Sequence, residues 1–228
     1  NFDAEYPFAI RIASGKIDAI TGAAWRDGLG ADPQDYLVLP AQPWLDGWCV
    51  EKGVIRQFVA APLGSGHTVE GQLTGEESVG GIQIVAYPMK RERARMWFAA
   101  QRRSRRDELG LQTCQSACES YGMGLGAGGQ MRQQIYEDQF GLDAWDQSRP
   151  SRCFVHLVNS LGWREITGNE APPTPITEAE YLRQGVPWFG YYDLEAKALP
   201  GSTALAGVRS VQELTASRAP GQVREASF

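Results

Sequence analysis

Alternation of hydrophobic and polar residues runs through the first 88 residues and predicts β-strands. Residues 9–12 and 16–20 alternate on either side of Ser14 and Gly15, which indicates a β-hairpin. Gly, Pro and Asp clusters separate the strands, a spacing typical of a sandwich or barrel rather than of alternating strands and helices. The further predicted strands are residues 36–39, 54–60 and 82–87.

The period becomes helical after Pro88 and predicts a helix over residues 89–109 and a shorter one over 111–121. One side of the first helix is apolar, with Met89, Met96, Trp97 and Ala100. Another side is basic, with Arg91, Arg95, Arg102 and Arg106. A glycine-rich run over residues 122–129 follows. It predicts a loop, because glycine loses much backbone entropy when it is ordered.

The pattern downstream of the glycine run is mixed. Residues 130–138 fit either a strand or a short helix, and β alternation returns over 153–159. A capping box at Thr177 predicts a helix through about Gln184. A weak helical pattern covers 208–214, before a polar tail.

Residues 8–22 and 154–168 resemble each other without a gap. Five of the fifteen positions are identical, namely Phe, Ser and an Ile-Thr-Gly triplet. Further downstream, Pro43-Trp44 parallels Pro187-Trp188. A repeated sequence usually has a repeated structural role. The polar residues His156 and Asn159 have no polar counterpart, so the resemblance predicts a duplicated scaffold rather than a duplicated active site.

Together these patterns predict an α+β fold that is predominantly β. Two related β-rich units, sandwich- or barrel-like, would flank a helical and glycine-rich middle segment. The expected units are residues 1–88, 89–150 and 151–215, followed by a flexible tail over 216–228.

Composition places the chain among folded globular proteins, since 43% of its 228 residues are hydrophobic and 21% are charged. No apolar run approaches the roughly 20 residues that span a bilayer, so we expect no membrane span. The four cysteines favour free thiols in a reducing compartment, hence the cytoplasm. The first residue is Asn1 rather than Met, which leaves secretion open.

Positive charge is concentrated in one segment. Residues 90–106 hold eight basic residues and one acidic residue, a net charge of +7. The total charge is −5, so the remaining residues carry −12. An acidic protein, RNA or an anionic lipid surface could meet this segment, or it could be a solvated helix face. The asymmetry favours self-association or an acidic protein partner, and we predict no specific nucleic acid.

The two Pro-Trp elements are candidate binding surfaces. Trp44 and Trp188 could serve as aromatic platforms that stack a sugar ring or a proline-rich peptide. Alternatively, each tryptophan fills the end of its own β unit.

Motifs for phosphate and metal binding are incomplete. Gly122-x-Gly124-x-x-Ala127 matches a dinucleotide-binding string, but a helix rather than a strand is predicted before it. Cys114 and Cys118 are four residues apart, and no second Cys/His pair completes a zinc site. The sequence therefore predicts no cofactor and no metal.

Catalytic side chains are also sparse. Cys153 and His156 are expected on opposite faces of a strand, with His156 half-buried, whereas His67 is expected in an exposed loop. The acidic residues Glu137, Asp138, Asp143 and Asp146 could form a calcium loop or a hydrolytic pair, but their spacing does not match an EF-hand.

These observations favour a non-catalytic protein that binds or self-assembles through its β units and basic helix. One alternative is a hydrolase that uses carboxylates of residues 137–146, or a thiol and His156, beneath the glycine-rich loop. The other is carbohydrate binding by Trp44 and Trp188.

Overall fold

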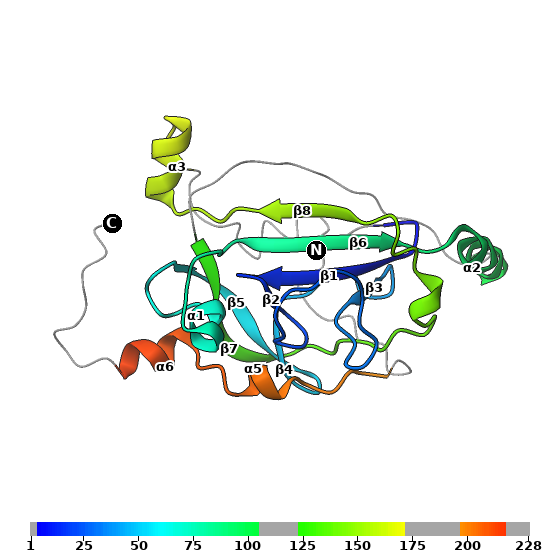
Figure 1. Ribbon diagram of the computed structural model, residues 1–228, viewed down its shortest axis with the longest axis horizontal. Coiled ribbons are helices and arrows are strands. Elements are labelled where there is room, and N and C mark those ends of the chain that lie inside the picture. Colours follow the sequence, from blue (N-terminus) through cyan, green and yellow to red (C-terminus); the bar gives the residue numbers. More distant parts are fainter. Residues whose placement is uncertain (1–3, 105–122, 172–196, 218–228) are drawn as a thin grey trace.

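The computed structural model describes residues 4–104, 123–171 and 197–217, and the fold is α+β with strand outweighing helix. Its strands form two antiparallel sheets, neither of them a closed barrel (Figure 1). The larger sheet has the order β2-β1-β6-β8, and β3 also pairs with β1. Its strands are β1 (Phe8–Ser14), β2 (Ile17–Asp18), β3 (Leu37–Leu39), β6 (Ile82–Pro88) and β8 (Ser151–Val155).

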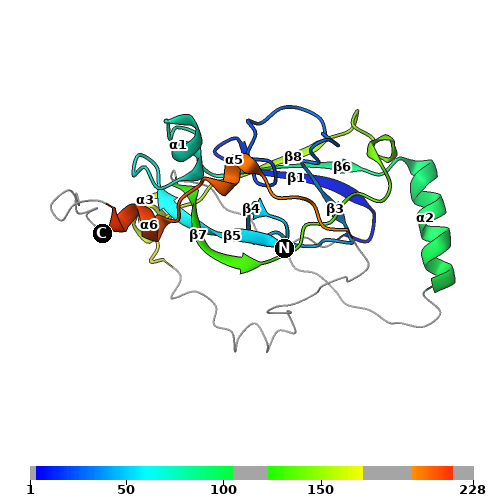
Figure 2. The ribbon, with the colours of Figure 1, turned by 90° about the horizontal axis from the view of Figure 1, so that it is seen from below.

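The smaller sheet has the order β4-β5-β7 and lies as a second layer against the larger one (Figure 2). Its strands are β4 (Gly47–Glu51), β5 (Val54–Pro62) and β7 (Met123–Arg132). Short helices surround the two layers. They are α1 (Val69–Thr74), α2 (Arg91–Ser104), the 3-10 helix η1 (Leu142–Ala144), α3 (Ser160–Thr167), α5 (Thr203–Ala206) and α6 (Val211–Ala216).

Strand β1 is buried on both faces and joins two hydrophobic clusters. Ile10 and Ile12 belong to the cluster shared with the smaller sheet, which includes Trp48. Ala9, one residue out of phase, belongs to a second cluster that contains Trp145. Because side chains alternate across a strand, a nearly continuous run of buried residues requires cover on both sides of the sheet.

The predicted N-terminal hairpin is confirmed, with its turn one residue later than expected. Ser14 pairs with Ile17, which leaves Gly15 and Lys16 as a two-residue loop. Both loop residues have a φ of 58°, as the tight turns that join twisted antiparallel strands require. The strands predicted at 36–39, 54–60 and 82–87 are also present, as β3, β5 and β6.

The prediction that residues 122–129 form a loop is wrong. Residues from Met123 onward form β7, which pairs with β5 from Pro62 to Val54. A Cβ on Gly126 would lie 2.6 Å from the carbonyl oxygen of His67 and 2.8 Å from a methyl of Val211. The absent side chains therefore let the α1 region and α6 pack closely on the strand, a role that glycine often has in sheets.

Helix α2 confirms the predicted basic helix as far as Ser104, and residues 105–109 lie outside the described residues. The apolar side is rotated from the prediction. Ala94 is buried and Trp97 is half-buried, whereas Met96 is 58% exposed and Ala100 is exposed. The helix packs along one narrow stripe near its start, so much of its apolar surface stays outside the core.

The two segments that resemble each other do not share a path. Residues 8–22 form β1, the hairpin and β2, but in the matched stretch a helix, α3, begins at Ser160. The Asn159 side chain accepts a hydrogen bond from the Gly162 N–H, and Gly168 ends the helix with a φ of 69°. The prediction of a duplicated scaffold is therefore wrong for this segment, because local capping favours a helix.

The remaining C-terminal elements differ in part from the prediction. The strand expected over 153–159 is β8, which ends at Val155 and pairs with β6 in the same sheet as β1. The weak helix near 208–214 is present as α6. Helix α1 and strand β4 lacked a clear sequence pattern. The helices predicted at 111–121 and 177–184 lie outside the described residues.

Among the described residues, no helix is both long enough and apolar enough to cross a bilayer.

Candidate functional site

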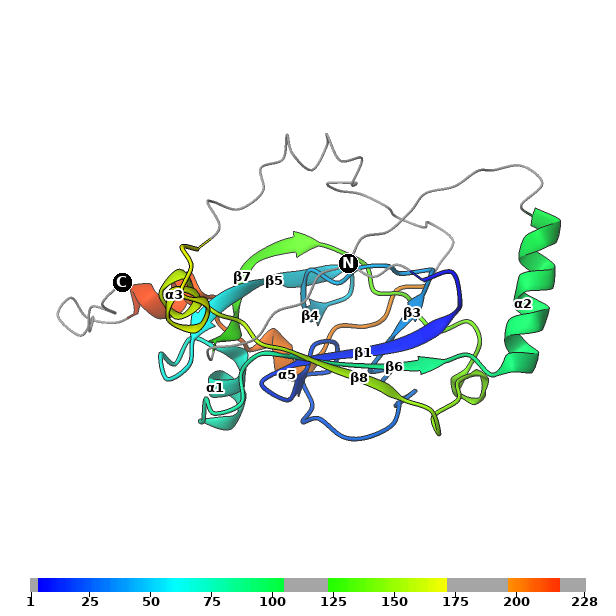
Figure 3. The same cartoon turned by 90° about the horizontal axis from the view of Figure 1, so that it is seen from above.

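Helix α2 projects from one end of the two layers, in all three views of the ribbon (Figures 1, 2 and 3). Its first turn is held by the body of the protein. The Lys90 N–H donates to the Ala144 carbonyl at 2.8 Å, and the Tyr6 hydroxyl donates to the Met89 carbonyl at 2.7 Å. The ring of Phe98 lies 5.9 Å from that of Tyr6. The helix is therefore anchored at its base.

The predicted arginines lie on the exposed surface of α2. Arg91, Arg95 and Arg102 are exposed, and none of them forms an ion pair with another described residue. Arg93, by contrast, lies 2.8 Å from the Asp143 carboxylate and holds the pKa of that acid below its usual value. Arg106 lies outside the described residues. Exposed cations without partners are available to another molecule.

Of the two candidate tryptophans, only Trp44 lies within the described residues, as do both histidines. Trp44 is half-buried beside β4, and Trp188 lies outside the described residues. His156 is exposed, with its ring 4.3 Å from that of Phe154, and His67 is half-buried. The predicted exposures of the two histidines are therefore reversed. Strand β8 ends before His156, and the backbone beside His67 packs on β7, where Thr68 bridges to Gly126.

Two cysteines are described, Cys49 and Cys153, and both are free thiols. Burial raises the pKa of the Cys49 thiol to about 11, so this group stays protonated at neutral pH. Cys153 is exposed on β8. The other pair, Cys114 and Cys118, lies outside the described residues.

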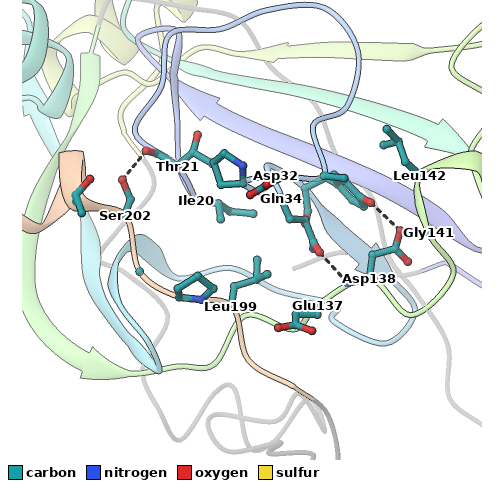
Figure 4. Close-up of a pocket in the computed structure, with 16 residues that line it drawn as sticks. Ile20, Thr21, Asp32, Gln34, Glu137, Asp138, Gly141, Leu142, Leu199 and Ser202 are labelled. Carbon is teal, nitrogen blue, oxygen red and sulfur yellow. Dashed lines mark hydrogen bonds between the residues drawn. The ribbon is translucent and has the colours of Figure 1, made fainter.

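A pocket of about 480 Å³ is a second candidate site (Figure 4). Its walls come from four separate segments, residues 20–21, 31–36, 137–142 and 199–203. Residues 135–137 and 197–199 pair as an antiparallel bridge, which brings two of these walls together. The Leu199 N–H donates to the Ile135 carbonyl and the Glu137 N–H to the Lys197 carbonyl. The Ser202 hydroxyl donates to the Thr21 carbonyl and closes the other end.

A hydrogen-bonded network fixes one wall of the pocket. The Tyr36 hydroxyl and the Trp145 indole N–H both donate to Oδ2 of Asp138, at 2.7 and 2.8 Å. Gln34 accepts from the Asp138 N–H and donates to the carbonyls of Tyr36 and Tyr136. Burial and the neighbouring Asp138 carboxylate raise the pKa of Tyr36, so its hydroxyl remains a donor.

The four acidic positions noted in the sequence are divided between two places. Glu137 and Asp138 line the pocket, whereas Asp143 pairs with Arg93 and Asp146 accepts from Ser148. The pocket lining includes neither His156 nor the glycines of β7. The pocket therefore does not match the hydrolase site predicted beneath a glycine-rich loop. Within the described segments, no three His, Cys, Asp or Glu side chains are placed to hold a metal ion.

A buried ion-pair network lies beneath the larger sheet. Arg11 is fully buried, with Nε 2.9 Å from the Asp18 carboxylate and Nη2 3.4 Å from that of Asp35. Its guanidinium lies over the Trp25 ring. Burial raises the pKa of Asp18, although hydrogen bonds from Thr21 and the charge of Arg11 oppose the rise. This network is enclosed, so we assign it a structural role.

Sequence reasoning found only part of the pocket. Glu137 and Asp138 were singled out by their charge, but Asp32, Gln34 and Ser202 belong to no motif. These side chains converge through contacts between distant segments, such as Ser202 with Thr21, 181 residues apart. The proline that follows Asp32 marks a turn but does not indicate a pocket.

Comparison of the chain with protein-family models, with curated proteins and with solved structures finds no match. The exposed arginines of α2 and the pocket are therefore the features on which a functional proposal depends.

Proposed function

We propose that this protein is a non-catalytic binding protein that self-assembles, with α2 of one copy meeting the acidic surface of another. The observation that carries the proposal is the exposure of Arg91, Arg95 and Arg102 on a projecting helix, with no ion pair to other described residues. Opposite charges on two surfaces of one chain attract copies of that chain and orient them.

Helix α2 also offers an apolar contact beside its charges. Met96 is 58% exposed and lies next to Arg95. Arginine and methionine are both enriched in protein interfaces, where an apolar centre is surrounded by polar groups. A basic helix that meets an acidic surface is a heterologous contact, which generates rings or open chains of subunits.

The acidic counterpart is supplied by the rest of the chain, which carries −12 against the +7 of residues 90–106. The proposal does not use the repeated β units expected from the sequence, because residues 8–22 and 160–168 adopt different structures. Hydrolysis, and carbohydrate binding by Trp44 and Trp188, are alternatives that no contact among the described residues favours over assembly.

The test is the molar mass of the purified chain, measured by light scattering at low and high ionic strength. We expect a mass above that of the monomer at low salt, which falls toward the monomer at high salt because salt screens exposed charges. The variant Arg91→Glu/Arg95→Glu/Arg102→Glu should be monomeric at both. A wild-type chain that is monomeric at low salt would refute the proposal.

A matched control separates a specific contact from a change in net charge. Lys52, Arg164 and Arg209 are exposed and lie between β4 and β5, on α3 and just before α6, so none of them belongs to α2 or its base. The triple variant Lys52→Glu/Arg164→Glu/Arg209→Glu has the same net charge as the α2 variant and should assemble like the wild type. Equal loss of assembly in both variants would mean that α2 is not the contact.

A further inference from the structure

The pocket described above has the size and the pre-formed wall of a small-molecule site. Its volume of about 480 Å³ lies within the range usual for such sites, roughly 300–1,000 Å³. Gln34 and Asp138 form hydrogen bonds to each other and to Tyr36. Gln34 also bonds the Tyr136 carbonyl, so this wall holds its shape without a ligand. A pre-formed wall lowers the entropic cost of binding.

All the charged residues that line the pocket are acidic. Three carboxylates line the pocket, those of Asp32, Glu137 and Asp138, and none of the lining residues is basic. Asp138 accepts from Tyr36 and Trp145 and is committed to the wall. Asp32 and Glu137 are exposed and form no side-chain hydrogen bond or ion pair with another described residue. Two carboxylates are therefore available to a ligand.

These two carboxylates come from different walls. Figure 4 shows Asp32 on the loop at one side of the pocket and Glu137 on the segment at the other, with Ile20 and Leu199 between them. The described acidic residues do not gather in threes around a common metal position. The arrangement therefore suits two separated positive groups better than one inorganic ion.

The surface between the carboxylates is apolar. Ile20 and Leu199 are almost fully buried and form part of the main hydrophobic cluster. The remaining apolar lining residues are Ala31, Pro33, Leu142 and Pro200. An aliphatic chain could lie on this surface and gain from removal of its methylene groups from water.

We propose that this pocket binds a small organic dication with an aliphatic body, of the alkyldiamine class, through charge-assisted hydrogen bonds to Asp32 and Glu137. The ammonium groups meet the carboxylates, and the methylene groups lie on Ile20 and Leu199. Such hydrogen bonds are about twice as strong as neutral ones. The inference is independent of assembly through α2, because no residue of α2 lines the pocket.

The direct test is calorimetric titration of the full chain with 1,4-diaminobutane at low ionic strength, because salt would screen the exposed carboxylates of Asp32 and Glu137. We expect saturable binding of one diamine per chain. 1,4-Butanediol, which has the same carbon chain without the charges, and magnesium chloride, which has the charge without the chain, should both bind at least tenfold more weakly. Absence of saturable diamine binding overturns the proposal, and so does equal affinity for either comparison compound.

Two variants locate the site. Asp32→Asn and Glu137→Gln keep the size of each side chain, and both positions are exposed, so the fold should be retained. Each should weaken diamine binding about tenfold, the loss expected for one charge-assisted hydrogen bond. Glu165→Gln, an exposed position on α3, is the control and should bind like the wild type. Unchanged affinity in both pocket variants would exclude this pocket.

Discussion

Residues 8–22 and 154–168 match at five of fifteen positions, yet they occupy different places in the fold. Both stretches begin in strands that pair with β6, but on its opposite edges and in different registers, with Phe8 opposite Pro88 and Phe154 opposite Gln83. After the shared serine the first chain turns back as a hairpin, whereas the second winds into α3. Shared residues are thus compatible with two conformations.

The positions that differ decide between the two outcomes. Gly15 occupies a turn with φ of 58°, where the other stretch has Leu161 within a helix. Asp18 is buried against Arg11, whereas its counterpart Arg164 is exposed and pairs with Glu170. The turn glycine Gly15, the N-cap Asn159 and the buried charge of Asp18 are not shared, and they decide the conformation. Gly22 and Gly168 are shared and both have a positive φ, so this glycine is compatible with either outcome.

Loss of the buried charge should have the largest effect. Arg11→Leu places in β1 the residue found at the matching position 157 and leaves the carboxylate of Asp18 buried without its cation. Asp35 would keep only its ion pair with the part-exposed Arg26. We expect the free energy of unfolding to fall by about 3–5 kcal/mol, measured by denaturant titration.

The matched change in the other stretch is Arg164→Leu, which removes an exposed ion pair with Glu170. Its expected cost is at most about 1 kcal/mol, because water screens exposed charges. Similar losses in the two variants would contradict the distinction between a buried and a surface pair.

The hairpin turn should be the next most sensitive feature. In Gly15→Leu, the Cβ would lie 2.3 Å from Oε2 of the Glu70 side chain, at a φ that non-glycine residues disfavour. We expect a loss of about 2–4 kcal/mol from backbone strain and crowding together, measured as a shift of the denaturation midpoint.

Gly168→Leu tests backbone strain without crowding. Gly168 has a φ of 69°, and no neighbouring heavy atom lies within 4 Å of the position that a Cβ would take. The expected loss there is about 1–2 kcal/mol at most. If Gly168→Leu destabilised the protein as much as Gly15→Leu, the contact with Glu70 would be irrelevant.

A smaller and local effect is expected at the start of α3. Asn159→Ala introduces the residue found at the matching position 13 and removes the side-chain acceptor of the Gly162 N–H. Loss of such a cap costs about 1 kcal/mol, and here it should appear as faster amide hydrogen exchange within α3. Exchange in β1 serves as the internal reference and should not change.

The smallest expected effect is on stability in acid. It concerns Glu77, which bonds the N-cap of α1, the helix against which the hairpin turn packs. Burial would raise the pKa of Glu77, but hydrogen bonds from Thr68 and Gly66 outweigh it and hold the pKa below 4.5. The folded state therefore binds this proton less readily than the unfolded state. The stabilisation is present above pH 4.5 and is lost as the pH falls through the folded pKa.

Glu77→Gln should flatten this part of the acid unfolding curve. Glu76→Gln, at the exposed neighbouring residue, is the control and should keep the wild-type slope. An unchanged slope in Glu77→Gln would show that other carboxylates dominate the acid limb.

Much of the larger sheet was predictable because its signals are local. Alternation at residues 9–12 and a glycine after Ser14 were sufficient to place the hairpin. The arginine-rich helix was predictable from its helical period. Its buried side was not, because Met96 and Trp97 are both apolar. Only the contact of Phe98 with Tyr6 in the folded protein shows which side meets the core. The pocket was recognisable only through Glu137 and Asp138.

The sequence by itself determined the short elements whose turns, caps and periods are encoded within a few residues, together with the separation of basic and acidic charge. Tertiary structure decided the rest. The glycines of β7 have no local preference for a strand, and they form one because β5 pairs with them and Thr68 and Val211 pack on them. The pocket likewise forms only where four segments distant in sequence meet. Its chemistry depends on contacts between these segments, which no local sequence pattern indicates.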